Sequence, residues 1–176
     1  MAHISNLTAG IYTSLCYNST AGALSTMDTS AELVALFATA PVEIQKIREF
    51  PEFGNPANIV NVPVYGQPVT SQVSGQADQN TMEFTINYIP SDLAALQALV
   101  QNGLVYAFQI ALASARPANF QQVATTGIAT GSVANTVFNF AGKFEAITVV
   151  PSLTDALTCK LTISMQTPLF GPATYA

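Results

Sequence analysis

Hydrophobic and polar residues alternate along several parts of the chain, most clearly between Met82 and Leu112. From Met82 to Tyr88 every second side chain is apolar, which predicts a strand with one buried and one solvent-facing side. The same period returns after Gly103, from Leu104 to Leu112, and predicts a second strand. The segment between them follows a helical period instead. We therefore expect a strand, helix, strand unit around which the other elements are arranged.

The helix of this unit has recognisable start and stop signals. Pro90 disfavours helical backbone at Ile89, Ser91 is a suitable N-cap, and Gly103 is placed to end the helix, which predicts a helix over about residues 91–102. Its apolar residues share one face and are Leu93, Leu96, Leu99 and Val100. We expect that face to lie flat on the sheet.

Other parts of the chain repeat the strand pattern. Strands are predicted for Val42–Phe50, the most charged part of the chain, and for residues 137–149, where phenylalanines alternate with Asn139, Lys143 and Glu145. The clearest alternation runs over Leu157–Met165, with its first residue on the apolar side. These patterns predict about six to eight strands and one helix, a mainly β fold of the β-sandwich or small-barrel type with the helix on its flank.

Two segments stand apart from the alternating strands. Residues 1–31 are rich in Ser, Thr, Ala and Gly, and we interpret them as an N-terminal arm and edge strand lying on the domain or on a neighbour. Residues 32–176 are then a single β-sandwich domain. Within it, residues 51–80 are rich in Gly, Pro, Asn and Gln, which predicts a long loop around one edge strand interrupted by Pro63. Because such long loops are usually ordered by a partner, we expect another copy of the chain to contact it.

The low content of charged residues favours self-assembly of the chain. Only 9% of the residues are charged while 49% are hydrophobic, which would leave the surface of a free monomer poorly solvated. We therefore expect the chain to cover part of its surface with copies of itself. A domain surfaced by Ser, Thr, Asn and Gln is the alternative. The net charge is −5 and the five basic residues are scattered, so no patch can grip nucleic acid.

Candidate chemistry is sparse. His3 is the single histidine, so no histidine-based catalytic triad and no multi-histidine metal site can be built within one chain. Neither Cys16 nor Cys159 has a histidine near it in sequence, and Cys159 lies on the apolar side of its predicted strand, so we interpret both as core thiols. We expect no catalytic, cofactor-binding or metal site, no cofactor and no enzymatic activity. The opening residues have no secretory signal pattern and the uncharged runs carry too many polar residues to span a membrane, so folding in the cytoplasm is expected.

Residues 40–166 resemble a known family in the order of their elements. The best-matching pieces are Phe50-Pro-Glu-Phe-Gly54, the strand and helix at Thr85–Leu99, and the segment from Phe140 to Ser164. They resemble the major tail tube proteins of long-tailed, siphophage-type bacteriophages. The resemblance implies a structural virion protein with a β-sandwich and one flanking helix, six copies in a ring, and rings stacked into a hollow tube that conducts the genome into the host.

The resemblance also implies partners and a location. The partners are the chain itself, the tape-measure, tail-terminator and distal tail proteins, and DNA that passes without specific binding. The protein belongs in the phage tail of the virion and is assembled in the host cytoplasm. A conduit for DNA should be polar and acidic inside. The candidate lumen-facing residues are Glu83, Thr85, Asn87 and Glu145, with Glu43 and Gln45 as further candidates. An outer, solvated face is the alternative for each of them.

Three other functions remain open at this point. A pilus or adhesin-type β-domain shares the low charge but predicts a signal peptide and a disulfide. A tube β-domain like that of type VI secretion shares the predicted architecture. A hydrolytic or sugar-binding sandwich requires a convergent polar pocket.

Overall fold

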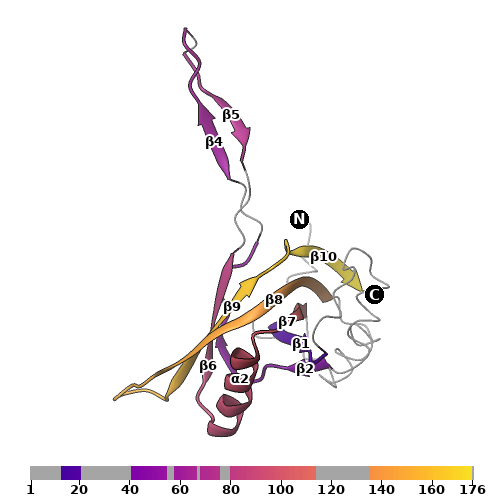
Figure 1. Cartoon of the computed structure of the whole chain (residues 1–176), viewed down its shortest axis with the longest axis vertical. Coiled ribbons are helices and arrows are strands. Elements are labelled where there is room, and N and C mark those ends of the chain that lie inside the picture. Colours follow the sequence, from indigo (N-terminus) through magenta and orange to yellow (C-terminus); the bar gives the residue numbers. More distant parts are fainter. Residues whose placement is uncertain are drawn as a thin grey trace, which may run out of the picture.

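The computed structural model describes residues 13–20, 41–54, 58–66, 68–75, 80–113 and 135–175. Over these ranges the chain is mainly β with one helix, and its elements are shown in Figure 1. The bounds, in chain order, are β1 Thr13–Asn18, β2 Pro41–Glu43, β3 Ile47–Glu49, β4 Ile59–Val62, β5 Ser71–Ser74, β6 Thr81–Asn87, α2 Pro90–Asn102, β7 Val105–Ala113, β8 Asn135–Val150, β9 Thr158–Met165 and β10 Phe170–Tyr175. The strand, helix, strand unit predicted from the sequence is therefore β6, α2 and β7.

Eight strands form one antiparallel sheet in the order β2-β1-β7-β8-β9-β6-β3, and β10 pairs with β8 beside that path. The two end strands, β2 and β3, are neighbours in sequence, so the sheet curls until both of its ends meet one short segment. Within that segment the Ile44 amide donates to the Leu15 carbonyl at 2.9 Å, and the Lys46 carbonyl accepts from the Asn87 amide at 3.1 Å. The result is a curled, half-barrel sheet, in agreement with the predicted barrel-like fold.

The single strand predicted for Val42–Phe50 is wrong in one respect. Lys46 has a φ of 62°, in the left-handed region, which divides the segment into β2 and β3. The division lets three intervening residues cross from one end of the sheet to the other. The apolar positions change parity here, from Val42 and Ile44 to Ile47, and this change is the sign in the sequence that one continuous strand is interrupted.

The N-terminal strand also differs from the expectation. β1 pairs with β2 on one side and with β7 on the other, so it is an inner strand and not an edge strand. Its residues from Ser14 to Asn18 are all buried, including two polar ones. The division of the chain into an arm and a domain at residue 32 stays a prediction, since residues 21–40 lie outside the described ranges.

The hydrophobic core lies inside the curl of the sheet and is rich in aromatic rings. Phe84, Phe108, Phe140 and Phe144 have no exposed surface. The rings of Phe108 and Phe140 stack with centroids 5.1 Å apart, and Phe144 meets Phe108 edge-on at 5.0 Å. Strands β6 and β9 bury every second residue along most of their length, as their alternation predicted. Each buried phenylalanine contributes about 1.5–3 kcal/mol by burial alone.

Strands β7 and β8 are buried on both faces where they pair. The sequence pattern placed Asn139 on the polar side of its strand and did not predict its burial. Gln109 and Asn139 face each other across the two strands and are 1% and 0% exposed. The Gln109 Nε2 donates to the Asn139 Oδ1 at 3.1 Å. A polar side chain opposite a row of phenylalanines suggests a solvent-facing side, but here neighbouring structure covers that side as well.

Helix α2 begins one residue earlier than predicted. Pro90 occupies the first turn, Ile89 is the N-cap with extended backbone, and the helix has no side-chain cap. The Ser91 hydroxyl instead donates to the Asp92 carboxylate at 3.1 Å. Gly103 ends the helix with a φ of 64°, as predicted. Leu96 is buried, and the other apolar residues of the predicted stripe are half-buried against the core, namely Leu93, Leu99 and Val100.

Candidate assembly interface

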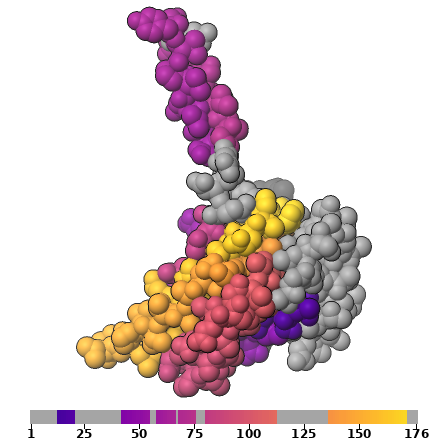
Figure 2. Space-filling view, viewed as in Figure 1, coloured from indigo at the N-terminus to yellow at the C-terminus, as the bar shows by residue number. Residues whose placement is uncertain are grey.

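A two-stranded hairpin projects from the body of the molecule (Figures 1 and 2). It is made by β4 and β5, with Ile59 opposite Ser74 at its base and Val62 opposite Ser71 toward its tip. At the base the Gly75 amide donates to the Asn58 carbonyl at 2.7 Å. We name the described part of this hairpin, residues 58–66 and 68–75, the hairpin arm. The loop predicted over residues 51–80 thus contains two paired strands and not one.

The hairpin arm exposes apolar side chains on both of its faces. Every described residue of the arm is exposed, and Tyr65 in the turn beyond β4 is 108% exposed. The exposed apolar residues are Ile59, Val60, Val62, Val64, Tyr65, Val69 and Val73. Their exposed area, summed over both faces, is on the order of 800 Å², and apolar surface gathered in this way typically marks an interaction site.

The arm lacks the charged side chains that often protect exposed strands from pairing. No charged residue occurs in its described part. The outer edges of β4 and β5 pair with no other described strand, so both offer backbone groups to a partner. An isolated hairpin is marginally stable in water, which favours a partner that covers this one.

The structure brings four of the predicted lumen residues to one face of the sheet. Glu83, Thr85 and Asn87 on β6 lie on the side opposite the core, as does Glu145 on β8. The Glu83 carboxylate accepts from Lys160 Nζ on β9 at 2.6 Å, and the Glu145 carboxylate accepts from the Ser164 hydroxyl at 2.7 Å. We name the outward-facing polar residues of β6, β9 and β8 the polar sheet face.

The other two predicted lumen residues, Glu43 and Gln45, lie at a hollow that Asn87 also borders. The hollow lies between β2, the end of β6 and helix α2. The six candidates therefore lie at two places that meet at Asn87, and the alternation of residues does not predict this division because it depends on the curl of the sheet. Which group faces a lumen stays a prediction.

The acids of the polar sheet face are compensated by bases. Lys160 contacts Glu83 as above, and Lys143 Nζ lies 3.6 Å from the Glu145 carboxylate. In the described ranges every lysine and arginine lies within ion-pair distance of an acid. The field over this face is consequently weaker than the acidic residues alone would produce.

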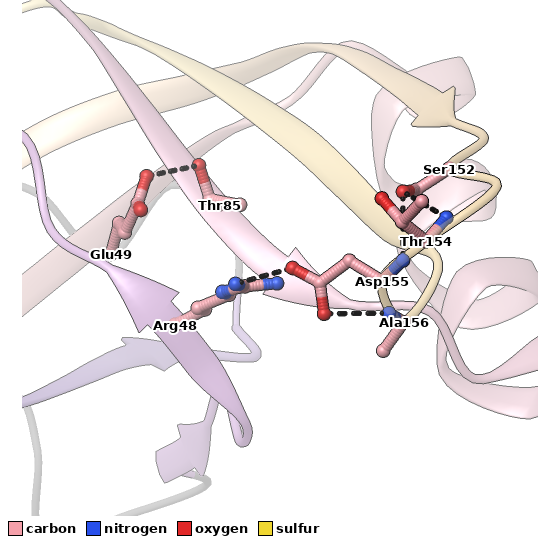
Figure 3. Close-up of polar contacts among 7 residues, drawn as sticks. All are labelled: Arg48, Glu49, Thr85, Ser152, Thr154, Asp155 and Ala156. Atoms are coloured by element: carbon pink, nitrogen blue, oxygen red, sulfur yellow. Dashed lines mark hydrogen bonds and ion pairs between the residues drawn. The ribbon is translucent and has the colours of Figure 1, made fainter.

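A second apolar surface lies at the turn between β8 and β9. Leu153 is 105% exposed, and the exposed apolar residues beside it are Val149, Val150 and Leu157. The turn is folded on itself, because the Ser152 hydroxyl accepts from the Asp155 amide at 3.0 Å (Figure 3). The prediction that Leu157 lies on the core side is wrong, since β9 begins at the next residue.

An ion pair fastens this turn to β3. The Arg48 guanidinium donates to the Asp155 carboxylate at 2.7 Å, as Figure 3 shows. This hydrogen bond, with one from the Ala156 amide, holds the pKa of Asp155 below its usual value. In the same view the Thr85 hydroxyl points to the Glu49 carboxylate at 3.4 Å. The contacts join β3 to β6 and to the turn, which fixes one end of the curled sheet.

The residues considered for other chemistry do not form a site. Cys16 and Cys159 are buried, and burial together with Glu43 raises the pKa of the Cys16 thiol to about 12. Among the described residues no group of His, Cys, Asp and Glu side chains could hold a metal ion. His3 lies outside the described residues. No helix in the described ranges is both long and apolar enough to cross a membrane.

Known proteins match this chain in fold but not in sequence. No protein-family model and no curated protein matches the sequence. A chain in the cryo-EM structure of the anti-feeding prophage (AFP) baseplate, symmetrised six-fold, superimposes with a TM-score of 0.55 and 9% sequence identity over 90% of this chain and 91% of that one. The two chains share a fold. An Hcp protein crystal structure aligns with a TM-score of 0.42 and 10% identity over 88% of each chain.

The shared fold confirms the predicted fold class. It is mainly β, with a curled sheet and a flanking helix, and it extends over nearly the full length of both chains. At 9% identity the likeness does not extend to function, which has to be argued from the surfaces described above.

Proposed function

We propose that this protein is a structural subunit of a phage tail or a related injection machine, and that it self-associates into rings that stack into a hollow tube. The hairpin arm is the observation that carries the proposal. It is uncharged over its described residues, exposed on both faces and open at both edges. A neighbouring copy would bury this surface and pair with its free backbone groups.

The size of the arm fits this role. A standard protein interface buries roughly 800 Å² on each partner, and the apolar side chains of the arm expose an area on that order. Seven of the thirteen exposed large apolar residues in the described ranges lie on the arm, so the arm carries the larger share of the exposed apolar surface. Self-association is thus favoured over a free monomer.

The finer features of the proposal follow from the same architecture. Six copies in a ring would match the six-fold symmetry applied to the AFP baseplate, whose chain shares the fold. The polar sheet face, with Glu83, Thr85 and Glu145, would line the tube and let DNA pass without binding. Tape-measure, tail-terminator and distal tail proteins would be the further partners, the assembled protein would be part of the virion, and no catalysis is required of it.

A secretion-type tube is the second candidate. The observation that favours it is the pairing of Glu83 with Lys160 and of Glu145 with Lys143 on the polar sheet face. A charge-compensated wall suits a protein cargo as well as a polyanion, because it neither attracts nor strongly repels either one. Packaging of DNA inside purified native particles would distinguish the two tubes.

The test of self-association is electron microscopy of the purified protein, with light scattering on the same sample over a series of concentrations. The matched variants are Val73→Lys on the hairpin arm and Gln97→Lys on the exposed side of α2. We expect rings or tubes of uniform diameter from the unchanged protein and from Gln97→Lys. Val73→Lys should remain monomeric with an unchanged circular dichroism spectrum. A monomer at every concentration, or normal tubes from Val73→Lys, would overturn the proposal.

A further inference from the structure

A hollow of about 320 Å³ lies beside helix α2, at the end of the molecule opposite the hairpin arm (Figure 1). Its inner wall is apolar and includes Ile44, Ile86, Leu96 and Leu99. Its rim is polar. Gln45 and Asn87 are exposed there, and Asp92 at the start of the helix lies 3.6 Å from Lys46 Nζ.

These properties define what the hollow can hold. An apolar wall with a hydrogen-bonding rim suits a side chain that is apolar along its length and polar at its end. An anionic occupant is disfavoured, because Glu43 and Asp92 both line the hollow. A lysine or arginine from the described part of a second copy is also disfavoured, because each of these side chains already lies beside an acid of its own chain. The volume lies at the lower end of the range for small binding pockets, which fits one large aromatic side chain.

Tyr65 is such a side chain, and its ring is not buried within its own chain. It lies in the turn beyond β4 on the hairpin arm and is 108% exposed, the largest exposed fraction of any described apolar residue. Its phenol could donate to Gln45 or Asn87 while its ring packs on the apolar wall. The arm and α2 lie at opposite ends of the long axis of the molecule, so Tyr65 cannot reach the hollow of its own chain (Figure 1).

We propose that Tyr65 of one copy inserts into the α2 hollow of the next copy along the tube. The two surfaces differ, so the contact is head-to-tail and repeats along a stack without closing into a pair. The inference rests on the proposed self-association and names the anchor that would join successive rings. A buried tyrosine in a preformed hollow is typical of the few residues that dominate an interface.

Disulfide formation between two single-cysteine variants tests this contact directly. Ala95 lines the hollow and is exposed on α2, so Val64→Cys protein, which keeps the neighbouring Tyr65, is mixed with Ala95→Cys protein under mild oxidation. The control partner is Ala98→Cys, which is exposed on the same helix but does not line the hollow. The two native cysteines are buried and should not compete. We expect disulfide-linked dimers from the Ala95→Cys mixture, at least tenfold more than from the control.

A second measurement uses the concentration at which particles first scatter light. Filling the hollow with Ala95→Phe should raise that concentration at least tenfold, Tyr65→Ser should do the same, and Tyr65→Phe should lie close to the unchanged protein. The double variant Tyr65→Ser, Ala95→Phe should be no worse than either single variant, because both remove one contact.

The outcomes separate this inference from the proposed function. Normal particle formation by Tyr65→Ser would refute the Tyr65 contact and leave self-association intact. Equal amounts of disulfide with Ala95→Cys and with Ala98→Cys would do the same. A chain that never assembles under any condition would refute both.

Discussion

Replacing the buried amide pair of Gln109 and Asn139 should stabilise the protein only if both residues are changed together. The pair makes one hydrogen bond of 3.1 Å, yet Gln109 Oε1 and Asn139 Nδ2 find no hydrogen-bond partner among the described residues. Each buried, unpaired polar atom costs about 1–3 kcal/mol, while the hydrogen bond contributes about 1 kcal/mol net. The pair is therefore a net cost to the folded state.

The magnitudes follow from this balance. Asn139→Leu alone removes the hydrogen bond and the unpaired Nδ2 but leaves both polar atoms of the Gln109 amide unpaired. The number of unpaired atoms stays at two, so the free energy of unfolding should fall by about 1 kcal/mol. Gln109→Met with Asn139→Leu removes every unpaired atom and should raise it by about 1–3 kcal/mol after the cost of fitting the larger leucine. For a chain of this size, each kcal/mol moves the melting temperature by roughly 2–4 °C.

The assay is urea unfolding followed by circular dichroism, below the concentration at which particles form. Gln101→Met, on the exposed side of α2, is the control and should change stability by less than about 0.5 kcal/mol. A double variant less stable than the unchanged protein, or two single effects that simply add, would refute the reasoning.

Three further predictions concern the sheet and its cysteines. Lys46→Gly should stabilise the protein by about 1 kcal/mol in urea unfolding, because glycine adopts the φ of 62° without the steric cost that lysine bears; a loss of stability would contradict this. Because Arg48 holds the pKa of Asp155 below its unfolded value, the pair should contribute stability above about pH 4 and lose that contribution as the pH falls through the lower, folded pKa. The urea midpoints of the unchanged protein and Asp155→Asn should thus differ slightly at pH 6 and low salt and converge near pH 2, and a difference independent of pH would count against the pair. Burial raises the pKa of Cys16 to about 12 and also raises that of Cys159, so a thiol reagent at pH 8 should label both cysteines only after unfolding, whereas rapid labelling of the native protein would show that they are accessible.

The candidate interface was predictable in outline only. The composition of residues 51–80 indicated a segment that a partner orders, and the low charge indicated self-association. That Ser71–Ser74 pairs with Ile59–Val62 was not predictable, because a strand with one apolar residue has no pattern to recognise. The hollow beside α2 was also not predictable, since its wall combines residues from four separate parts of the chain.

The sequence by itself determined the elements whose burial is one-sided. In β6 and β9 one face meets the core and the other meets solvent, so the alternation of side chains records the strand directly. Gly103 likewise marks the end of α2, because its left-handed backbone is a local requirement.

Only the tertiary structure decided what depends on residues far apart in sequence. The curl of the sheet makes β1 an inner strand and divides the predicted lumen residues between two places. It also buries Asn139 despite its polar pattern, because both faces of β8 are covered there. Burial is a property of the neighbours that the fold supplies, and a local pattern records only the residue's own preference.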